Sequence, residues 1–572
     1  MVEIMFTLIL YMFLVIPIGI YLYYVTTNKK TIADSVFNRI DNGIYKITGI
    51  NPQNQMNWKQ YVVALVVTNG VMILVGYLIL RFQGILFFNP NGIGGMESSL
   101  SFNTVISFMT NTNLQHYSGE SGLSYFSQMA VITFMMFTSA ASGYAACTAF
   151  VRGLVGKDKI AMGNFFSDLI RITTRVLLPL SIVVGLLLVW QGVPQTLSSN
   201  VTATTIEGSM QDIAMGPVAS LESIKHIGTN GGGFFGANST TPFENPTIWS
   251  NIFELYSMML LPGACVVMFG KMIAEQKKNI MKVKKSVMGS EGRTIFTAMS
   301  NIFVIGLSLC YFAEMAGNPT LANAGLSQSM GSMEGKEVRF GVDASALFTT
   351  VTTSFTTGTV NNMHDTLTPL GGLVPLLHMM LNLVFGGKGV GLMNMIIYVI
   401  LSVFICSLMI GRTPEYLGKK IEGKEMKLTA LCIIIHPLLI LGFSALAVTT
   451  SSGLCGITNE GFHGLSQVLY EFSSSAANNG SGFEGLGDNS VFWNITTGLA
   501  MFFGRYVSLV IQLAIAGSLM KKQLVNETVG TLKTDTATFA FVLVLIVYIF
   551  AGLTFFPVLS LGPVAEHFSL WG

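Results

Sequence analysis

Ten long apolar stretches divide this chain, and they constrain its fold more than any other feature of the sequence. Each is about 20 residues or longer, which is the length that a helix needs to cross the roughly 30 Å hydrocarbon layer of a bilayer. Only 10% of the 572 residues are charged and 51% are hydrophobic, whereas a soluble chain carries roughly 25% charged residues. The sequence therefore predicts an all-α polytopic membrane protein with about ten transmembrane helices, at residues 4–24, 61–80, 130–150, 169–190, 249–272, 294–314, 373–410, 427–449, 491–519 and 537–560.

Lysine and arginine are concentrated in every second connection between these stretches. Short loops rich in these residues stay in the cytoplasm. The first stretch carries Glu3 and lacks a basic n-region, so we expect a retained helix rather than a cleaved signal. Five cytoplasmic connections and ten spans place both termini outside, and the basic clusters are insertion signals, with no nucleic-acid partner. The five connections, residues 25–60, 151–168, 273–293, 411–427 and 520–536, hold 22 of the 31 basic residues, whereas the opposite side holds Arg81, Lys225, Lys336 and Arg339.

Four outside connections contain the same internal repeat. Each has a short amphipathic run that is too short to span a bilayer and ends in a polar cluster of Thr, Ser, Asn and Gly. The four read SFNTVISFMTNTNLQ, SLESIKHIGTNGGGFF, DASALFTTVTTSFTTGTVNN and GLSQVLYEFSSSAANNGSG. Aligning them places Asn113, Gly231, Gly358 and Gly480 in register, at separations of 118, 127 and 122 residues.

Each polar cluster lies between two apolar stretches, so the repeat unit is a helix, a re-entrant pore loop and a second helix. We expect four pseudo-symmetric repeats around a central selectivity filter, with one extra helix at each end. The boundaries are residues 1–60 for the N-terminal extra helix and cytoplasmic loop, 61–150, 151–272, 273–410 and 411–519 for repeats 1 to 4, and 520–572 for the C-terminal extra helix.

The polar clusters fit a site for a dehydrated monovalent cation. Re-entrant backbone inside a membrane is tolerated where it lines a water-filled path. Four short helices would aim their C-terminal ends, each with about half a negative charge, at one point. Backbone carbonyls can replace the water of such an ion, and glycine lets four loops approach closely. No ring of acidic side chains lies in the clusters, which argues against a divalent-cation site. Glu120, Asp365 and Glu484 lie just beyond three clusters, where they either concentrate cations or are ordinary solvated residues.

The same motifs resemble a known family over essentially the whole chain. The matching strings are TNTNLQHYSGE, GTNGGGFFGANSTTPFENPT, GTVNNMHD, GGKGVGLMNM, GRTPEYLGKKIEGKEMK and ANNGSGFEGL. They resemble the potassium-binding A subunit (KdpA family) of the bacterial Kdp potassium-importing P-type ATPase complex, within the superfamily of K⁺ transporters. Thr357 departs from this pattern, because a member of the family has cysteine there. The resemblance implies a K⁺ filter built from Asn111, Thr112, Asn113, Gln115, Thr229, Asn230, Gly231, Thr357, Gly358, Asn478, Asn479 and Gly480.

The resemblance also implies partners. It implies a channel-like subunit in the cell membrane that selects extracellular potassium and passes it to an ATP-hydrolysing P-type subunit (KdpB-like). Small KdpC-like and KdpF-like subunits complete the complex. This chain contains neither DKTG nor GxxxxGK[ST], so we expect no catalytic centre and no bound nucleotide here. The glycines of GTNGGGFF therefore belong to an ion filter rather than to a phosphate loop.

Two basic residues inside apolar stretches are candidates for a barrier below the filter. A charge at the bilayer centre costs about 2.5–3.5 kcal/mol on insertion scales, so each is expected to face a cavity or a partner. Lys388 lies at a glycine-rich break in the seventh stretch, and Arg505 lies in the ninth. We expect the pair to form a gate or barrier; the alternative is that Lys388 snorkels and Arg505 neutralises helix C-termini.

Two other function classes stay open on the residues alone. One is a stand-alone channel or cation-coupled uptake protein with the same filter. The other is a membrane enzyme whose active site uses these loops. No single loop carries a cluster of Asp, Glu and His with acid/base spacing, which argues against the enzyme.

Overall fold

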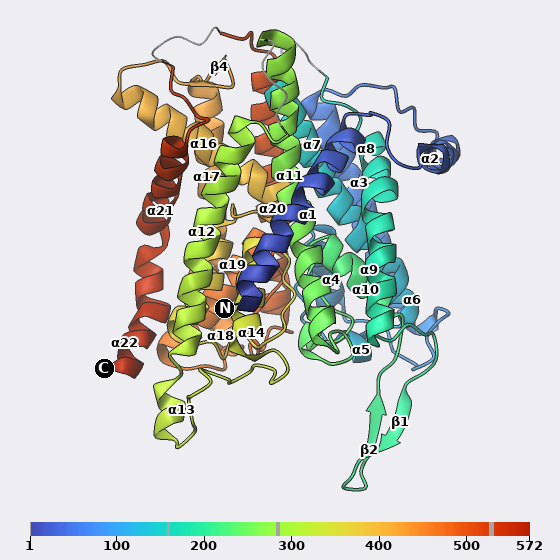
Figure 1. The fold of residues 1–572 in the computed structure, drawn as a ribbon. Coiled ribbons are helices and arrows are strands. Elements are labelled where there is room, and N and C mark those ends of the chain that lie inside the picture. Colours follow the sequence, from blue (N-terminus) through green and yellow to red (C-terminus); the bar gives the residue numbers. More distant parts are fainter. Residues whose placement is uncertain (1, 157–160, 282–286, 526–530) are drawn as a thin grey trace.

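The computed structural model describes residues 2–156, 161–281, 287–525 and 531–572. Among these residues, ten helical segments are long and apolar enough to cross a membrane, and they form one bundle (Figure 1). Nine of the ten predicted stretches fall within them, and the seventh, residues 373–410, does so only from residue 387 to residue 409. The segments are α1 (Val2–Thr26), α3 with η1 (Trp58–Phe82, Gln83–Ile85), α6, η2 and α7 (Tyr125–Ser127, Gln128–Thr133, Phe134–Val155), α8, η3 and α9 (Phe165–Ile172, Thr173–Leu177, Leu178–Gln191), α11 (Ile248–Met281), α12 (Ser290–Met315), η5 and α16 (Gly387–Gly389, Val390–Met409), α17 (Gly423–Thr449), α20 (Val491–Met520), and α21, η6 and α22 (Ala537–Leu559, Ser560–Val564, Ala565–Trp571).

The spans differ in how far they are enclosed by the rest of the chain. In α11 and in the segment that ends with α7, 83% and 78% of the apolar window is buried, against 17% in α3. α7 and α11 therefore surround the centre of the bundle, whereas α3 presents most of its surface outward.

Four further helices, of 12, 10, 14 and 17 residues, are too short to cross a bilayer. They correspond to the four amphipathic runs in the sequence, and most of their side chains are buried despite many being polar. The set consists of α4 (Ser98–Met109), α10 (Val218–Ile227), α14 (Gly341–Ser354) and α19 (Gly461–Ala477). We call these the pore helices.

The seventh predicted stretch is broken into two helices. α15 (Pro369–Leu381) ends at Asn382, whose left-handed backbone (φ 48°) caps the helix by donating to the His378 carbonyl. The chain resumes a helical course at η5 and α16. The amide of Asn382 also donates to the Ala477 carbonyl at the end of α19 (3.3 Å), so the break is tied to the fourth pore helix.

Outside the bundle, the described part of the chain forms short helices and two small antiparallel hairpins, which an all-helical reading of the sequence does not contain. β1 pairs with β2 from Val201↔Ile213 to Thr204↔Met210, and this ribbon extends away from the bundle (Figure 1). The remaining elements are β1 (Val201–Thr204), β2 (Met210–Ile213), β3 (Glu415–Tyr416), β4 (Lys419–Lys420), α2 (Asp34–Thr48), α5 (Gly119–Gly122), η4 (Asn238–Thr240), α13 (Pro319–Asn323) and α18 (Ser451–Leu454).

Candidate cation-binding site

The four pore helices all end in the same backbone motif. In each, a left-handed residue lies one or two positions beyond the last helical residue, and the N–H after it donates to the carbonyl five residues earlier, as in a Schellman cap. The left-handed residues are Asn111, Thr229, Thr356 and Asn478, with φ of 61°, 49°, 51° and 56°. The donor and acceptor pairs are Thr112 to Ser107 (2.9 Å), Asn230 to Lys225 (2.8 Å), Thr357 to Thr352 (2.8 Å) and Asn479 to Ser474 (2.9 Å).

A second left-handed residue follows two positions later in every loop. We call the three consecutive positions inner, middle and outer, the inner one being the nearest of the three to the helix. The alternation of conformation is the same in all four copies, so four equivalent backbone segments are presented to one centre. The inner residues are Asn111, Thr229, Thr356 and Asn478, the middle ones Thr112, Asn230, Thr357 and Asn479, and the outer ones Asn113, Gly231, Gly358 and Gly480, with outer φ of 59°, 112°, 97° and 108°.

The four loops contact one another in chain order around a closed ring. A Cβ on Gly231 would overlap the Thr357 carbonyl oxygen, and one on Gly358 would overlap that of Asn479. In the same way, a Cβ on Gly480 would overlap the Thr112 carbonyl oxygen, which closes loop 4 onto loop 1. Glycine is required at these outer positions both by the backbone conformation and by the close approach.

The first loop differs, because its outer residue is Asn113. This residue is 1% exposed, and neither atom of its amide has a hydrogen-bond partner among the described residues. A Cβ on Gly232 would meet the Asn113 carbonyl, so loop 1 contacts loop 2 through a different glycine.

All four middle carbonyls of the ring lack a hydrogen-bond donor among the described residues. Their residues, Thr112, Asn230, Thr357 and Asn479, are 0% exposed. Within the described ranges, no N–H or O–H group is hydrogen-bonded to any of these four carbonyl oxygens. Buried carbonyls are normally paired. Four of them facing one ring without a donor can coordinate a cation that has lost its water.

The asparagine side chains tie the loops together behind this ring. Asn111 donates to the Thr229 carbonyl (2.7 Å), and Asn230 donates to the Asn111 side-chain oxygen (2.9 Å). Asn478 donates to the Thr112 hydroxyl (3.0 Å) in the same manner. The amides of these asparagines therefore hold the backbone of the loops in place.

Gln115 clamps loop 1 to loop 2 above the ring. Its amide nitrogen donates to the Gly233 carbonyl (3.0 Å), and its oxygen accepts from the Gly233 N–H (2.9 Å). The two bonds fix the spacing of these loops, because both the donor and the acceptor of one residue are engaged.

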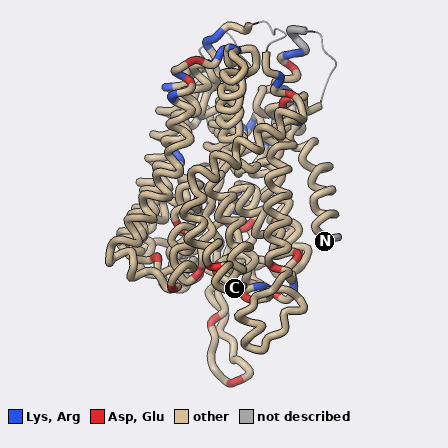
Figure 2. Tube along the Cα trace, turned by 90° about the vertical axis from the view of Figure 1, so that its left-hand side faces the viewer, with Lys and Arg blue, Asp and Glu red and all other residues tan. Residues whose placement is uncertain are grey.

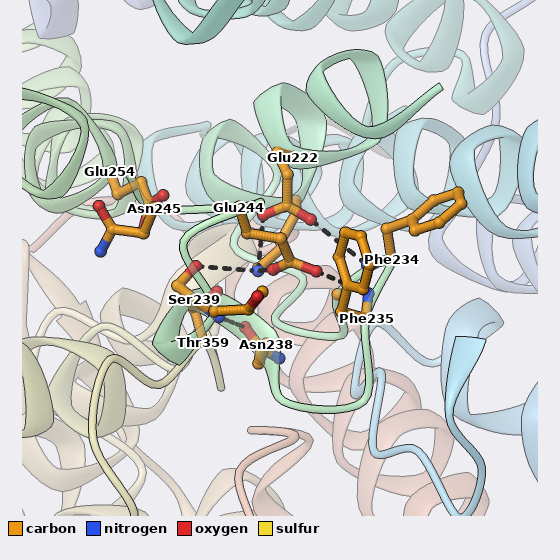
Figure 3. A network of polar contacts seen from close by, with 12 residues as sticks. Glu222, Phe234, Phe235, Asn238, Ser239, Glu244, Asn245, Glu254 and Thr359 are labelled. Atoms are coloured by element: carbon orange, nitrogen blue, oxygen red, sulfur yellow. Dashed lines mark hydrogen bonds and ion pairs between the residues drawn. The ribbon is translucent and has the colours of Figure 1, made fainter. Parts of the chain in front are cut away.

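A buried ion cluster supports the second loop. Lys225 on α10 is 0% exposed and donates to Glu222 and Glu244 (2.7 Å each) and to Ser239 (3.2 Å). Figure 3 shows these partners converging, with Glu244 also accepting the Phe235 N–H (2.7 Å). The neighbouring Asn238 donates to the Gly231 carbonyl (2.8 Å). The cluster thus folds residues 234–244 back over the loop.

The outer side of the ring opens into a small cavity of about 130 Å³. Gln115, Gly358, Gly480 and Glu484 are among its lining residues, and burial raises the pKa of Glu484 to about 7. Of the other two acidic residues considered for the mouth, Glu120 accepts the Gly236 N–H (2.8 Å) and Asp365 contacts His463 (3.1 Å). These two brace loops and are not simply solvated.

The inner side of the ring is closed by the broken seventh span. The Lys388 ammonium donates to the inner carbonyls of Asn111 (2.6 Å) and Asn478 (2.7 Å). Arg505 is 4% exposed. Both side chains approach Gly143 of α7, where a Cβ would overlap each of them. The structure therefore brings the two predicted barrier residues together directly beneath the loops.

A family model described as KdpA, the potassium-transporting ATPase A subunit, matches residues 5–568. The chain belongs to the KdpA family. A relative from Clostridium acetobutylicum, the potassium-transporting ATPase potassium-binding subunit, is 57% identical over 568 residues, which cover 99% of each chain. The potassium transporter TrkH from Vibrio parahaemolyticus has a similar fold, with a TM-score of 0.51 and 13% identity over 78% of this chain and 83% of that one.

Two features of this KdpA chain are not among those predicted from its sequence. Thr356 occupies the inner position of loop 3, although only Thr357 and Gly358 were assigned there. The spacing of the repeats could have identified Thr356, because it lies two positions before the outer residue Gly358, as the inner residue does in each of the other three loops. The Lys225 cluster was also missed, because Glu244 lies 19 residues from Lys225 and no local pattern links them.

Proposed function

We propose that this KdpA-family chain selects extracellular potassium in the four-loop ring and passes it to an ATP-hydrolysing partner. The observation that carries the proposal is the set of four buried middle carbonyls without donors. A potassium ion stripped of water needs such a ring of oxygens, and the C-terminal ends of four pore helices add negative potential. The name of the Clostridium relative, a potassium-binding subunit, supports the same reading.

The proposed filter consists of the twelve residues identified from the sequence. They act in two ways. The backbone carbonyls at the middle and outer positions coordinate the ion, and the Asn and Gln side chains hold the loops to one another by hydrogen bonds. The same reading divides the chain into four pore repeats, residues 61–150, 151–272, 273–410 and 411–519, between an extra segment at residues 1–60 and another at residues 520–572. The filter set is Asn111, Thr112, Asn113, Gln115, Thr229, Asn230, Gly231, Thr357, Gly358, Asn478, Asn479 and Gly480, to which the structure adds Thr356.

The chain is proposed to act in a complex. Its family description is an ATPase A subunit, so ATP hydrolysis is assigned to a KdpB-like P-type partner, with small KdpC-like and KdpF-like subunits beside it in a bacterial cell membrane. K⁺ is the transported ion, and this chain binds no nucleotide in the proposal.

The proposed orientation follows from charge. Lysine and arginine gather at one end of the molecule (Figure 2), and both ends of the chain lie toward the other end (Figure 1). Positively charged loops remain in the cytoplasm. Both termini and the outer cavity above the filter are therefore assigned to the outside.

Lys388 and Arg505 are proposed to form the barrier below the filter. The Arg505 guanidinium and the Cβ of Lys388 approach the same glycine of α7, and the Lys388 ammonium lies at the inner carbonyls, so two buried positive charges oppose the passage of a cation toward the cytoplasm. Loss of this barrier should be visible as potassium leakage through the complex.

The test is potassium-stimulated ATP hydrolysis by the chain purified with its native companions. Gly231→Asp should abolish stimulation at low potassium while the complex stays assembled. Gly94→Asp is the matched control, since Gly94 lies in an exposed loop with nothing near its added Cβ. Potassium-independent hydrolysis by the unaltered complex would overturn the pump proposal, and the absence of any copurifying ATPase would favour a stand-alone channel.

A further inference from the structure

The Lys388 ammonium has the surroundings of a bound ion rather than those of a protein ion pair. It is 0% exposed, and among the described residues no carboxylate forms a salt bridge with it. Its two ligands are backbone carbonyls from different loops, those of Asn111 and Asn478, at 2.6 and 2.7 Å. A buried charge is stable only where other groups compensate it. Here the compensation comes from carbonyl oxygens and from the C-terminal ends of the pore helices.

The inner and middle carbonyls of the ring differ in how they are satisfied. At the inner level, the Asn111 and Asn478 carbonyls accept from Lys388, and the Thr229 carbonyl accepts from the Asn111 amide (2.7 Å). At the middle level, none of the four carbonyls has a donor within the described residues. Among the described residues, three of the four inner carbonyls are therefore engaged by the protein, Thr356 being the exception, whereas all four middle carbonyls are open to an ion.

Backbone contacts of the segment around Lys388 fix its side chain at the inner carbonyls. Lys388 itself is left-handed (φ 50°) between Gly387 and Gly389. A Cβ on Gly387 would overlap the Thr229 hydroxyl and approach the Phe355 carbonyl. Asn394 at the start of α16 donates to the Asn382 carbonyl (2.6 Å), which ties the two ends of the break together. The backbone of the break thus lies against loops 2 and 3 while its lysine reaches loops 1 and 4.

We propose that the Lys388 ammonium is a permanently tethered occupant of the innermost ion position. An ammonium group and a potassium ion carry the same charge and are similar in size, so the lysine takes the carbonyl ligands that a further ion would use. The transported ions are held from the middle level outward. The role goes beyond repulsion, because removing the amino group frees a position for one more ion. This inference rests on the proposed potassium filter.

The test is to locate rubidium, a heavy substitute for potassium, by anomalous diffraction or by density differences in the purified complex. In the unaltered protein, rubidium should occupy the middle level and be absent between the Asn111 and Asn478 carbonyls. Lys388→Met should add one rubidium peak at that inner position. A rubidium peak there in the unaltered protein would overturn the proposal, and this outcome does not depend on the folding of a variant.

The matched control is Lys419→Met. Lys419 is also buried and also donates to backbone carbonyls, those of Gly153 (3.2 Å) and Leu154 (2.7 Å), but it contacts no filter loop. The Lys419→Met substitution should leave the rubidium positions unchanged. Rubidium at the middle level without a new inner peak in Lys388→Met would reject the tethered occupant alone. Absence of rubidium from every level in both proteins would instead reject the proposed filter.

Discussion

The α-carbon of Gly231 in the second loop lies so close to the carbonyl oxygen of Thr357 in the third that no side chain fits between them. The same relationship joins Gly358 to Asn479 and Gly480 to Thr112. The ring is thus closed by contacts between a glycine and the middle carbonyl of the next loop. The groups that would coordinate the ion are also the groups that set the spacing of the loops.

Gly231→Ala should weaken potassium binding without unfolding the chain. The added Cβ meets the Thr357 carbonyl, and alanine at φ 112° is strained, at a cost of about 1–3 kcal/mol. A cost in that range raises the potassium concentration for half-maximal ATPase activity by about 5-fold to about 150-fold. Gly442→Ala, at an exposed glycine of α17 with open space around it, should leave that concentration unchanged. Equal effects of the two substitutions would contradict the ring geometry.

Gln115→Leu should loosen the contact between loops 1 and 2. It removes two hydrogen bonds to Gly233, each worth about 0.5–1.5 kcal/mol, and we expect about a tenfold rise in the potassium concentration for half-maximal activity. On the exposed surface, Gln195 makes a comparable pair of bonds to Ser220, donating to its hydroxyl (3.2 Å) and accepting from its backbone N–H (2.9 Å). Gln195→Leu is therefore the control, and a similar shift in both variants would count against the clamp.

Lys225→Met should destabilise the protein strongly. It leaves Glu222 and Glu244 buried without their cation, which typically costs about 3–5 kcal/mol. Denaturant unfolding of the purified complex, followed by circular dichroism, measures the change. Lys59→Met, at an exposed lysine, should alter the free energy of unfolding by no more than about 0.5 kcal/mol. A Lys225→Met variant as stable as Lys59→Met would show that the cluster does not support the fold.

The stability of the protein should fall as the pH rises from about 6.5 to about 9. Burial alone would lower the pKa of His116, but the carboxylates of Asp488 and Glu471 outweigh it and raise the pKa to about 9. Because the folded pKa lies above the ordinary value of 6.5, the stabilisation is complete below that value and is lost as the pH passes 9. The loss is of order 3 kcal/mol, measured as thermal unfolding across this range.

His116→Gln should flatten this alkaline slope, whereas His364→Gln should retain it. Burial and Lys336 lower the pKa of His364 to about 3, so its contribution is present above pH 6.5 and is lost only as the pH falls. An unchanged slope in His116→Gln would assign the pH dependence to other groups.

The membrane spans and the pore loops could be predicted because their signals are local. Length and hydropathy define the spans, and the glycine at the outer position marks three of the four loops. Thr356 could not be distinguished from its threonine neighbours, since only its left-handed backbone sets it apart. The hydrogen bond from Lys388 to the Asn111 carbonyl joins residues that are 277 positions apart in the sequence. The positive charge of Lys388 inside an apolar stretch therefore indicated a barrier, but nothing local indicated its contact with the filter carbonyls.

Asn113 shows what a ring made from one continuous chain allows. In a filter assembled from four identical subunits, each substitution would be copied to every side of the ion. Here one quarter carries an amide-bearing residue where the other three carry glycine. A substitution can therefore change one loop of the ring without changing the other three, so the surroundings that the ring offers to an ion need not be equal on its four sides.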